Sequence, residues 1–588
     1  MLGWLTGLLD KWRWARLGKF TADFETTTDF DDCRVWAFAC CDVDDPAFVV
    51  YGNSIEGFME WCASVDDSIV WFHNLKFDGE FIYNHLLDNG WKWVVWDDFK
   101  NAQPQSFSTL ISDKGQHYAA KLKFTKNHVI ELRDSLKVIS LPVRDIPKAF
   151  GLEDDAKLEL DYTAKRERGH VLTDEEKAYI REDVVIVAKA MKQLLDAGMN
   201  KLTAGSNALA HYKETVGGHR KFRKLFPVPD YDEEVRKAYK GGFTYADPRF
   251  TGRDVGSGIS FDVNSLYPSV MAYKMLPYGD PKTFVGEYVR DAKYPLFVQA
   301  VKIDCKLKDG HIPCIQVKEG AYSDRFSPTE YVSDTKGPVV RYLTNVDLEL
   351  IREQYHVFDI EYLQGWKFKA SDKLFREFIE EANAAKVEAA RTGNAGKRFM
   401  EKIKMNSSYG KLGTNPVCVS CKPVKRDGRV YYEHLPEEHR EPIYIAGACF
   451  ITAYARAQTI RAAQANYERF LYADTDSIYL KGTEPPNGID VDDYRLGAWK
   501  HEHTFQRFKA LRAKTYVFEE DGELVIHCAG LPKRCYDYVP EQGEEVPQDC
   551  LTKVTFENFE IGAKYWGKLF NAHVNGGIVL YNRFFTIR

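Results

Sequence analysis

Two aspartates stand one residue apart in "LYADTDSIYL", a stretch whose alternation is typical of a β-strand or β-hairpin. In that pattern Asp474 and Asp476 point to one face, together with Tyr472 and Ile478. Like charges at this spacing repel each other, and burial makes the repulsion more costly. The pair therefore needs neutralising cations, and divalent metal ions are cations that carboxylate oxygens bind well.

Further acids recur near the N-terminus, in "KFTADFETT" and "FHNLKFDGEF". Alternation in the first segment puts Asp23 and Glu25 on one face of a strand, while Ala22 and Phe24 point the other way. Asn74 and Asp78 in the second segment are four residues apart, at the start of an expected helix.

A third early segment, "LTDEEKAYIREDVVIVAKAM", begins with the capping box Thr173 to Glu176 and continues with a long helical pattern. Tyr179 and Asp183 lie one turn apart on that helix. Any one of these acids alone is more often a solvated surface group. Together, hard oxygen donors of this kind can hold two Mg2+ or Mn2+ ions at a phosphodiester, and Tyr179 can orient the attacking water.

The ordered motifs D-x-E-T, N-x3-D and Y-x3-D resemble those of DnaQ-like 3′–5′ proofreading exonucleases. The resemblance implies Asp23, Glu25 and Asp183 as metal ligands, with Asp78 and Tyr179 also catalytic. "KLELDY", ahead of the third motif, resembles an element of protein-primed DNA polymerases. Contacts to DNA or to a priming protein are implied for His73, Asn74, Phe77, Lys157 and Tyr162, although Phe77 fits a plain core position equally well.

A second acidic site is expected where "SGISFDVNSLYPSVM" ends a strand at Asp262 and turns into "SLYP". Free backbone N–H groups in such a turn suit a triphosphate beside the carboxylate-bound metal. An acid that simply closes a strand is the alternative.

The segment 392–411 carries five lysines and arginines against one glutamate. Arg398, Lys402, Asn406 and Tyr409 fall on one stripe of the expected helix. Most charged runs are solvated faces, but this stripe ends in an amide and an aromatic ring. We expect the cations to hold phosphates and Tyr409 to face a base pair.

Read together, "DVNSLYP", "KIKMNSSYG", "YADTDS" and "KTY" resemble the motifs of family B DNA polymerases, and the "YKGG" segment and compact exonuclease are similar to the protein-primed subgroup typified by phi29-like phage enzymes. The resemblance implies Asp262, Asp474 and Asp476 as catalytic, with two Mg2+ ions per site, for which Mn2+ can substitute. It places Asp262, Val263 and Asp476 at the metals. Nucleotide-binding residues would be Val263, Tyr267 as a steric gate against ribonucleotides, Arg398, Lys402, Asn406 and Tyr409; contacts to DNA or a priming protein would include Tyr239, Ser265, Lys514 and Tyr516.

The elements that position these residues follow from the same resemblance: an α/β and α+β multidomain chain, with an RNase H-like exonuclease before a right-hand polymerase. The expected parts are an exonuclease at 1–200, palm at 201–277 and 437–545, insertions at 278–369 and 412–436, fingers at 370–411, and a thumb at 546–588. The residues themselves show only irregular segments in both insertions, and a strand in "GGIVLYNRFFTI".

Composition fits a multidomain globular protein: 588 residues, 44% hydrophobic, with a net charge of −6 that excludes a polycation. Nucleic acid must therefore bind to local basic surfaces. No apolar run approaches membrane-spanning length, and residues 1–20 predict a short amphipathic helix. The resemblance implies a monomer in the cytoplasm of a host bacterium, encoded by a phage or linear plasmid, with template, primer, dNTPs and a terminal protein as partners.

Three other functions remain open at this point. A nuclease with a degenerate polymerase half is disfavoured because Asp262, Lys402, Tyr409 and Asp476 are all present. A reverse transcriptase-like enzyme would share the metal chemistry but would not need the exonuclease motifs. A non-catalytic DNA-binding scaffold would be distinguished by the absence of metal-dependent nucleotide incorporation.

Overall fold

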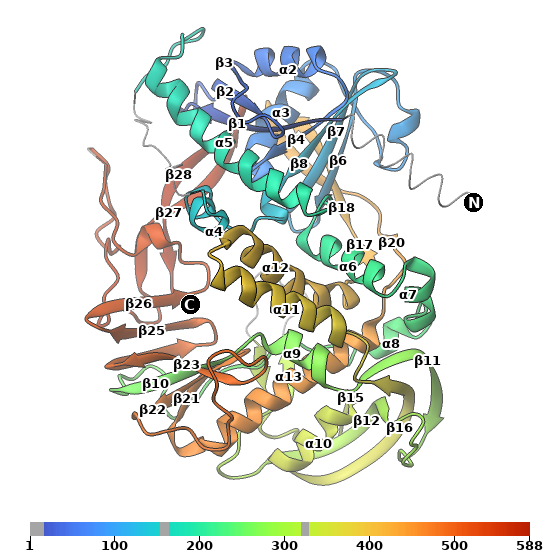
Figure 1. Ribbon diagram of the computed structural model, residues 1–588. Helices are drawn as coiled ribbons and strands as arrows, with labels where there is room; N and C mark the ends of the chain where they lie inside the picture. The colour runs from blue at the N-terminus through green and yellow to red at the C-terminus, as the bar shows by residue number, and fades with distance from the viewer. Residues whose placement is uncertain (1–16, 153–163, 319–328, 542) are drawn as a thin grey trace.

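The computed structural model describes residues 17–152, 164–318, 329–541 and 543–588 (Figure 1). Most of the predicted N-terminal amphipathic helix, and the predicted contact residues Lys157 and Tyr162, lie outside these ranges. None of the described helices combines the length and apolar character needed to cross a membrane.

The N-terminal part folds around a mixed ten-stranded sheet of order β19-β18-β6-β7-β8-β4-β1-β2-β3, with β5 paired to β6. β4 runs parallel to both β1 and β8 in its centre. The last two strands of the sheet, β18 and β19, come from a much later part of the chain. The strands are β1 (Gly18–Thr26), β2 (Val35–Asp42), β3 (Val49–Gly52), β4 (Ser68–Phe72), β5 (Lys92–Trp93), β6 (Ser106–Ser112), β7 (His117–Thr125), β8 (His128–Asp134), β18 (Ser420–Arg426) and β19 (Arg429–His434).

Helices cover both faces of this sheet, which explains why β2 is apolar on both sides (Figure 1). α2 (Ile55–Ser64) and α3 (Leu75–Asp88) pack on one face, and α5 (Asp174–Asp196) packs on the other beside the short α4 (Ile146–Phe150). The capping box at the start of α5 is confirmed, since the Glu176 N–H donates to Thr173 Oγ1 and the Thr173 N–H donates to Glu176 Oε2.

A second, five-stranded antiparallel sheet has the order β23-β10-β22-β21-β9. Between the N-terminal part and this sheet, the chain forms three helices: α6 (Ala204–Thr215), α7 (His219–Leu225) and α8 (Asp232–Arg236). α9 (Leu266–Tyr273) and the long α13 (Ile445–Ala465) share its largest apolar core. The strands are β9 (Thr244–Ala246), β10 (Gly258–Val263), β21 (Phe470–Asp474), β22 (Ser477–Lys481) and β23 (Trp499–Phe505).

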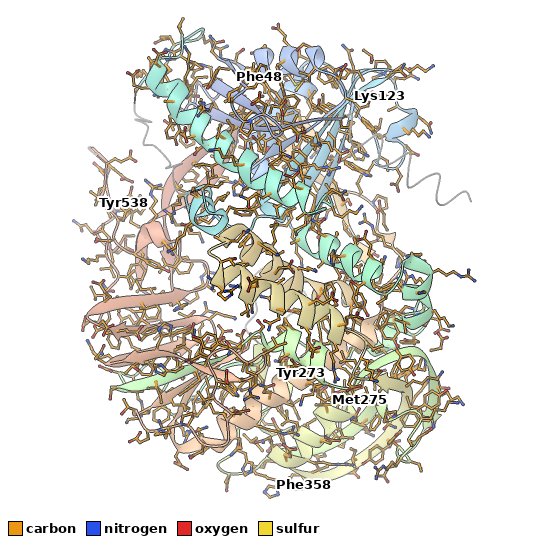
Figure 2. All side chains as sticks on the ribbon, viewed as in Figure 1. Phe48, Lys123, Tyr273, Met275, Phe358 and Tyr538 are labelled. Carbon is orange, nitrogen blue, oxygen red and sulfur yellow. The ribbon has the colours of Figure 1, made fainter. Side chains whose placement is uncertain are left out.

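Two packed helices, α11 (Arg376–Arg391) and α12 (Ala395–Leu412), stand between the two sheets (Figure 1). α12 confirms the helix predicted at 392–411. Below α11, Tyr273 and Met275 lie exposed at the end of α9 and just after it (Figure 2).

The described residues between 276 and 371 include a four-stranded sheet, β11-β16-β12-β15, with α10 against it. The expectation of irregular structure was therefore wrong for this insertion, and it was also wrong for the insertion at 412–436, which forms the hairpin β18–β19. Within β16 only Tyr355, Gly365, Trp366 and Phe368 are buried, and two register shifts interrupt its pairing with β12, so that its apolar alternation is broken along its length. The elements are β11 (Leu276–Val285), β12 (Leu296–Leu307), β13 (Gln316–Lys318), β14 (Thr329–Tyr331), β15 (Val339–Thr344), α10 (Asn345–Gln354) and β16 (Tyr355–Ser371).

The chain ends in a three-stranded sheet and a long hairpin, which runs up beside the N-terminal sheet (Figure 1). The predicted strand in the last residues is confirmed as β28. The elements are β24 (Arg507–Arg512), β25 (Thr515–Glu520), β26 (Glu523–Cys528), β27 (Lys564–Val574) and β28 (Gly577–Thr586), with the short pair β17 (Val417–Cys418) and β20 (Glu438–His439) and the 3-10 helices η1 (Phe99–Asn101), η2 (Ser135–Lys137), η3 (Val143–Asp145), η4 (Tyr467–Arg469) and η5 (Lys533–Cys535).

Candidate active sites

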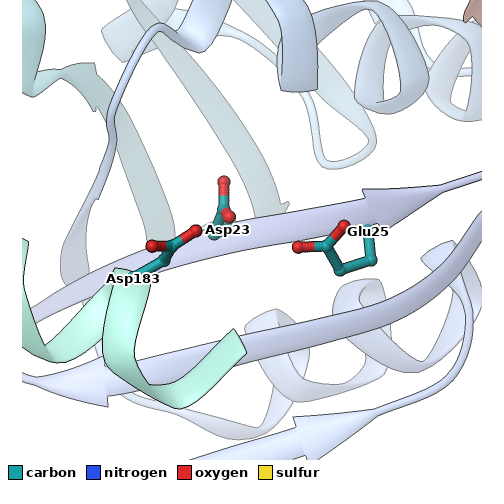
Figure 3. Close-up of side chains that lie close together, drawn as sticks. All are labelled: Asp23, Glu25 and Asp183. Atoms are coloured by element: carbon teal, nitrogen blue, oxygen red, sulfur yellow. The ribbon is translucent and has the colours of Figure 1, made fainter. Parts of the chain in front are cut away.

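The first candidate site is a carboxylate triplet between β1 and α5. Asp23, Glu25 and Asp183 each offer one oxygen, and these oxygens lie within 4.8 Å of one another (Figure 3). Alternation along β1 puts Asp23 and Glu25 on the predicted common face, and α5 brings Asp183 against it. Within the described ranges, no other three His, Cys, Asp or Glu side chains come together in this way.

Asp78 on α3 extends the triplet with a buried carboxylate, which is 3% exposed. Burial, and then the charges of Asp23 and Glu25, raise the pKa of Asp78 well above its ordinary value. Such a cluster of hard oxygen donors is stabilised by a bound divalent cation, so the side chains fit a metal site. Tyr179 is buried one turn before Asp183 on α5, as predicted.

Three of the residues predicted to contact a DNA strand lie at the start of α3, the helix that carries Asp78. Asn74 caps α3 in a left-handed conformation, with a φ of 82°, and is exposed. His73 has Nδ1 2.9 Å from Ser135 Oγ and Nε2 2.7 Å from the Leu141 carbonyl oxygen, so both ring nitrogens already have protein partners. Phe77 is half-buried against Phe81, with ring centroids 5.6 Å apart.

The second candidate site is formed by β10 and the hairpin β21–β22. Asp262 pairs across the sheet with Ser477, and the Val263 N–H donates to the Asp476 carbonyl oxygen at 2.8 Å. The turn between β21 and β22 runs through Thr475, which has a φ of 62°. Of the two readings open for "YADTDS", the hairpin is therefore correct: Asp474 ends a strand, whereas Asp476 lies in the turn.

The three aspartates of this second site have different electrostatic surroundings. Burial is the first cause that raises the pKa of Asp262 to about 8 and that of Asp476 to about 6, and Glu502 adds to both. Asp474 instead forms an ion pair with Lys514. The cation that the sequence predicts for this pair is thus a lysine at Asp474, whereas no such ion pair is found for Asp262 or Asp476 among the described residues.

The basic stripe of α12 faces this site. Arg398, Lys402 and Asn406 are exposed, and Lys402 lies close enough to oppose the rise in the pKa of Asp262. Tyr409 stacks on Tyr267 of α9, with ring centroids 4.2 Å apart and planes 25° apart. Cations and paired aromatic rings therefore lie beside two acids, as an incoming nucleoside triphosphate would require.

The "YKGG" segment packs directly on the same site. A Cβ on Gly242 would lie 2.7 Å from Thr475 Cγ2 and 2.9 Å from Tyr267 Oη, so only glycine fits without displacement. Tyr239 lies against Gly413, just after α12. Buried Arg456 donates to the Lys240 and Gly241 carbonyl oxygens, at 3.0 Å each, and holds the segment in place.

Two more predicted contact residues have well-defined surroundings. Ser265 caps α9 in a left-handed conformation, with a φ of 54°. Tyr516 is 4% exposed, and its hydroxyl lies 3.0 Å from that of Tyr479. This burial does not support the predicted direct grip of Tyr516 on a primer.

Sequence reasoning missed three charged residues at the second site. Lys500 and Glu502 lie on β23, the strand that pairs with Asp262, and both affect its pKa. Lys386 on α11 is near enough to the basic stripe to be affected by it: burial, and then the charges of Lys402 and Arg398, lower the pKa of Lys386. No motif marks these residues; the alternation of "WKHEHTF" predicts a strand but not its neighbour.

Comparisons with known proteins identify the family of the chain. A model of the family described as DNA polymerase type B, organellar and viral, matches residues 62–493. The DNA polymerases of Bacillus phage B103 and Bacillus phage phi29 are each 40% identical to this chain, over alignments that cover 97% of it and 99% of each relative. The structure of phi29 DNA polymerase with primer-template DNA and incoming nucleotide substrates is 38% identical, with a TM-score of 0.88 over 97% of this chain and 100% of that one. By its sequence and its fold, this chain belongs to the type B DNA polymerases of organelles and viruses.

Proposed function

We propose that the chain is a DNA-directed DNA polymerase with a 3′–5′ proofreading exonuclease, which replicates linear DNA processively while displacing the other strand. The observation that carries this proposal is the pairing of β10 with β22, which puts Asp476 beside Asp262 under the Tyr267–Tyr409 stack. The similarity to polymerases solved with primer-template DNA and nucleotides supports it.

In synthesis, Asp262 and Asp476, with Val263 beside them, would hold two Mg2+ ions, for which Mn2+ can substitute. Bound metal would lower the pKa of the attacking hydroxyl and stabilise the leaving pyrophosphate. Arg398, Lys402 and Asn406 would bind the triphosphate, and Tyr409 would face the new base pair. Tyr267 would exclude a ribose 2′-OH by steric clash.

In proofreading, Asp23, Glu25 and Asp183 would hold the metal ions, with Asp78 beside them. Tyr179 would orient the water that attacks the last phosphodiester. His73, Asn74 and Phe77 would receive the frayed primer end, together with Lys157 and Tyr162. Tyr239 and Ser265 would guide the primer or the priming protein, and Lys514 would approach the primer from its ion pair with Asp474.

Synthesis would begin on a hydroxyl of a terminal protein, since that hydroxyl and a primer 3′-OH can attack the same α-phosphate. The exonuclease, palm, fingers, thumb and two insertions would have the boundaries predicted from the sequence. Insertion 412–436 would help to enclose the DNA, so that dissociation requires opening a ring. We place the enzyme, as a monomer, in the cytoplasm of a host bacterium.

A singly primed circular template tests the proposal, with Mg2+, dNTPs and purified protein but no clamp or helicase. Products many times the length of the circle are expected, because processive synthesis and strand displacement would then occur together. A primer that only shortens would refute the polymerase and leave the nuclease. Addition of dNMP to a separately supplied terminal protein would test protein priming.

A further inference from the structure

Three distant parts of the chain meet at one buried carboxylate. Glu80 on α3 is 1% exposed. Tyr432 on β19 donates its hydroxyl to Glu80 Oε1 at 2.6 Å. His573 on β27 has Nδ1 3.4 Å from Glu80 Oε2. We call these three side chains the Glu80 junction; it connects the N-terminal sheet, the hairpin β18–β19 and the C-terminal hairpin β27–β28.

The face of α3 that carries Glu80 continues to bind the hairpin β18–β19. Asn84 and Asp88 follow Glu80 at intervals of four residues, so the three form one stripe. Lys425 donates Nζ to both Asp88 carboxylate oxygens at 2.7 Å, and also to Asn84 Oδ1. One face of α3 therefore contacts the hairpin at two points, through Tyr432 and through Lys425.

The two hairpins also meet at their tips. A Cβ on Gly428, in the β18–β19 turn, would lie 3.5 Å from Asn575 Cβ in the β27–β28 turn. Gly576 has a φ of 97°, and a Cβ there would be 2.1 Å from the Cys33 carbonyl oxygen, so the second turn is pressed against the N-terminal part. Beyond that turn, Ile578 joins the apolar core around α3.

Apolar residues of similar size could fill the same volume as the polar side chains of the junction. Ionised groups and their partners in a core often contribute no more stability than apolar residues of similar size, but they fix one arrangement. Glu80 Oε2 and His573 Nδ1 are both buried, and each lacks a hydrogen bond to the described residues, yet they face each other. A protonated His573 would complete this contact, and its pKa is raised first by Glu80.

We propose that Glu80 is a positioning residue for processive synthesis, which holds the two hairpins together on α3 so that the ring around the DNA stays closed. This inference rests on the proposed function, and it names the residues that keep the ring closed. Glu80 lies two positions after Asp78, but its carboxylate contacts Tyr432 and His573 of the two hairpins. The junction should therefore govern how long the DNA stays bound, and not the addition of each nucleotide.

The first test compares Tyr432→Phe and Glu80→Gln with Tyr431→Phe, a matched control at the neighbouring residue, which is 44% exposed. Product length on a primed circle is measured with a DNA trap that permits one binding event, beside the rate of single-nucleotide addition on a short duplex. We expect products about tenfold shorter for the two junction variants, from the loss of one charge-assisted buried hydrogen bond. Single-nucleotide addition should not change, and Tyr431→Phe should match the unmodified protein.

Wild-type product lengths in both junction variants would overturn the inference, as would an equal loss of single-nucleotide addition. Failure of the unmodified protein to add nucleotides would instead overturn the proposed function.

A disulfide between the tips gives a second test that does not depend on weakening the fold. The expected Cβ separation of 3.5 Å between residues 428 and 575 is within disulfide range. Gly428→Cys with Asn575→Cys, oxidised after the Glu80→Gln variant has bound primed circular DNA, should restore long products, and reduction should shorten them again. Product lengths that do not respond to oxidation and reduction, once the cross-link is confirmed by mass, would contradict a role in closure.

Discussion

Asp262 and Lys500 lie directly opposite each other on the antiparallel strands β10 and β23. Burial, and then the charges of Asp476 and Glu502, raise the pKa of Asp262 to about 8, and the nearby charges of Lys402 and Lys500 oppose the rise. Because a carboxylate must lose its proton to bind a metal ion, this lysine would favour the metal binding that we propose for Asp262.

Replacing Lys500 with glutamine should move the acidic limb of the pH–rate profile for nucleotide addition to higher pH. The loss of one nearby positive charge leaves Asp262 protonated over a wider range, and we expect a shift of about half a pH unit. Lys481→Gln, on the exposed end of β22 in the same sheet, is the control and should not shift the profile. Identical profiles for the Lys500 variant and the unmodified protein would remove this role.

Asp262→Asn should stabilise the metal-free protein while it abolishes synthesis. The pKa of Asp262 is about 8 in the folded protein and about 3.8 when unfolded, so the folded state binds more protons between these values and loses stability as the pH rises. Asparagine removes this loss, and a gain of about 2 kcal/mol at pH 8 is expected once partial solvent screening is considered. Thermal unfolding in EDTA should show the difference at pH 8 and none near pH 4.

The two acidic sites should be separable by mutation. Asp476→Ala should abolish nucleotide addition and retain exonuclease activity, because the carboxylates of the two sites come from different sheets. Asp23→Ala with Glu25→Ala should do the reverse. Both activities are measured on one labelled primer-template, with and without dNTPs. Loss of both activities in either variant would indicate a shared site or a misfolded protein.

Tyr267→Val should admit ribonucleotides. The ring of Tyr267 is held in place by stacking on Tyr409, and its removal leaves room for a 2′-OH; we expect discrimination against ribonucleotides to fall by about 100-fold. The ratio of kcat/KM for dNTP and rNTP is the measurement. Tyr273→Val, at the exposed end of the same helix (Figure 2), is the control and should leave the ratio unchanged.

Adding one methyl group to the "YKGG" segment should impair synthesis only at its second glycine. A Cβ on Gly242 would collide with Thr475 and Tyr267, whereas one on Gly241 meets no atom within 4 Å. Gly242→Ala should therefore reduce the rate of nucleotide addition by about tenfold or more, and Gly241→Ala should not. Equal rates in the two variants would show that the segment can shift to accommodate the methyl group with no effect on nucleotide addition.

Local patterns in the sequence are enough to nominate the residues proposed for both sites, because each motif lies on one strand end, turn or helix face. The stripe through Lys402 and Tyr409 and the capping box of Thr173 and Glu176 are of this kind. Partners supplied by distant strands could not be predicted: the ion pair of Asp474 with Lys514, and Lys500 opposite Asp262, depend on sheet order. Burial of Tyr516 likewise follows from packing that no local periodicity encodes.

The fold was predictable where helix and strand periodicities were strong, as in α5, α12 and β28. It was missed in the first insertion, where register shifts in the pairing of β16 with β12 interrupt the apolar alternation, so that the partner strands define β16. The Glu80 junction was also not predictable, since glutamate is an ordinary surface residue and no local pattern connects Glu80 with Tyr432 or His573.

The apolar core of the N-terminal sheet includes Cys421, from the hairpin β18–β19, and Val574, Ile578 and Val579, from the end of the chain. A ribosome makes β1 to β8 early, supplies Cys421 much later, and supplies the three residues of the C-terminal hairpin only when translation is almost complete. The N-terminal part therefore reaches its final stability after the rest of the chain has been made. The nascent chain would carry an unfinished nuclease until termination, and a fragment cut near residue 200 would be an unreliable substitute for it.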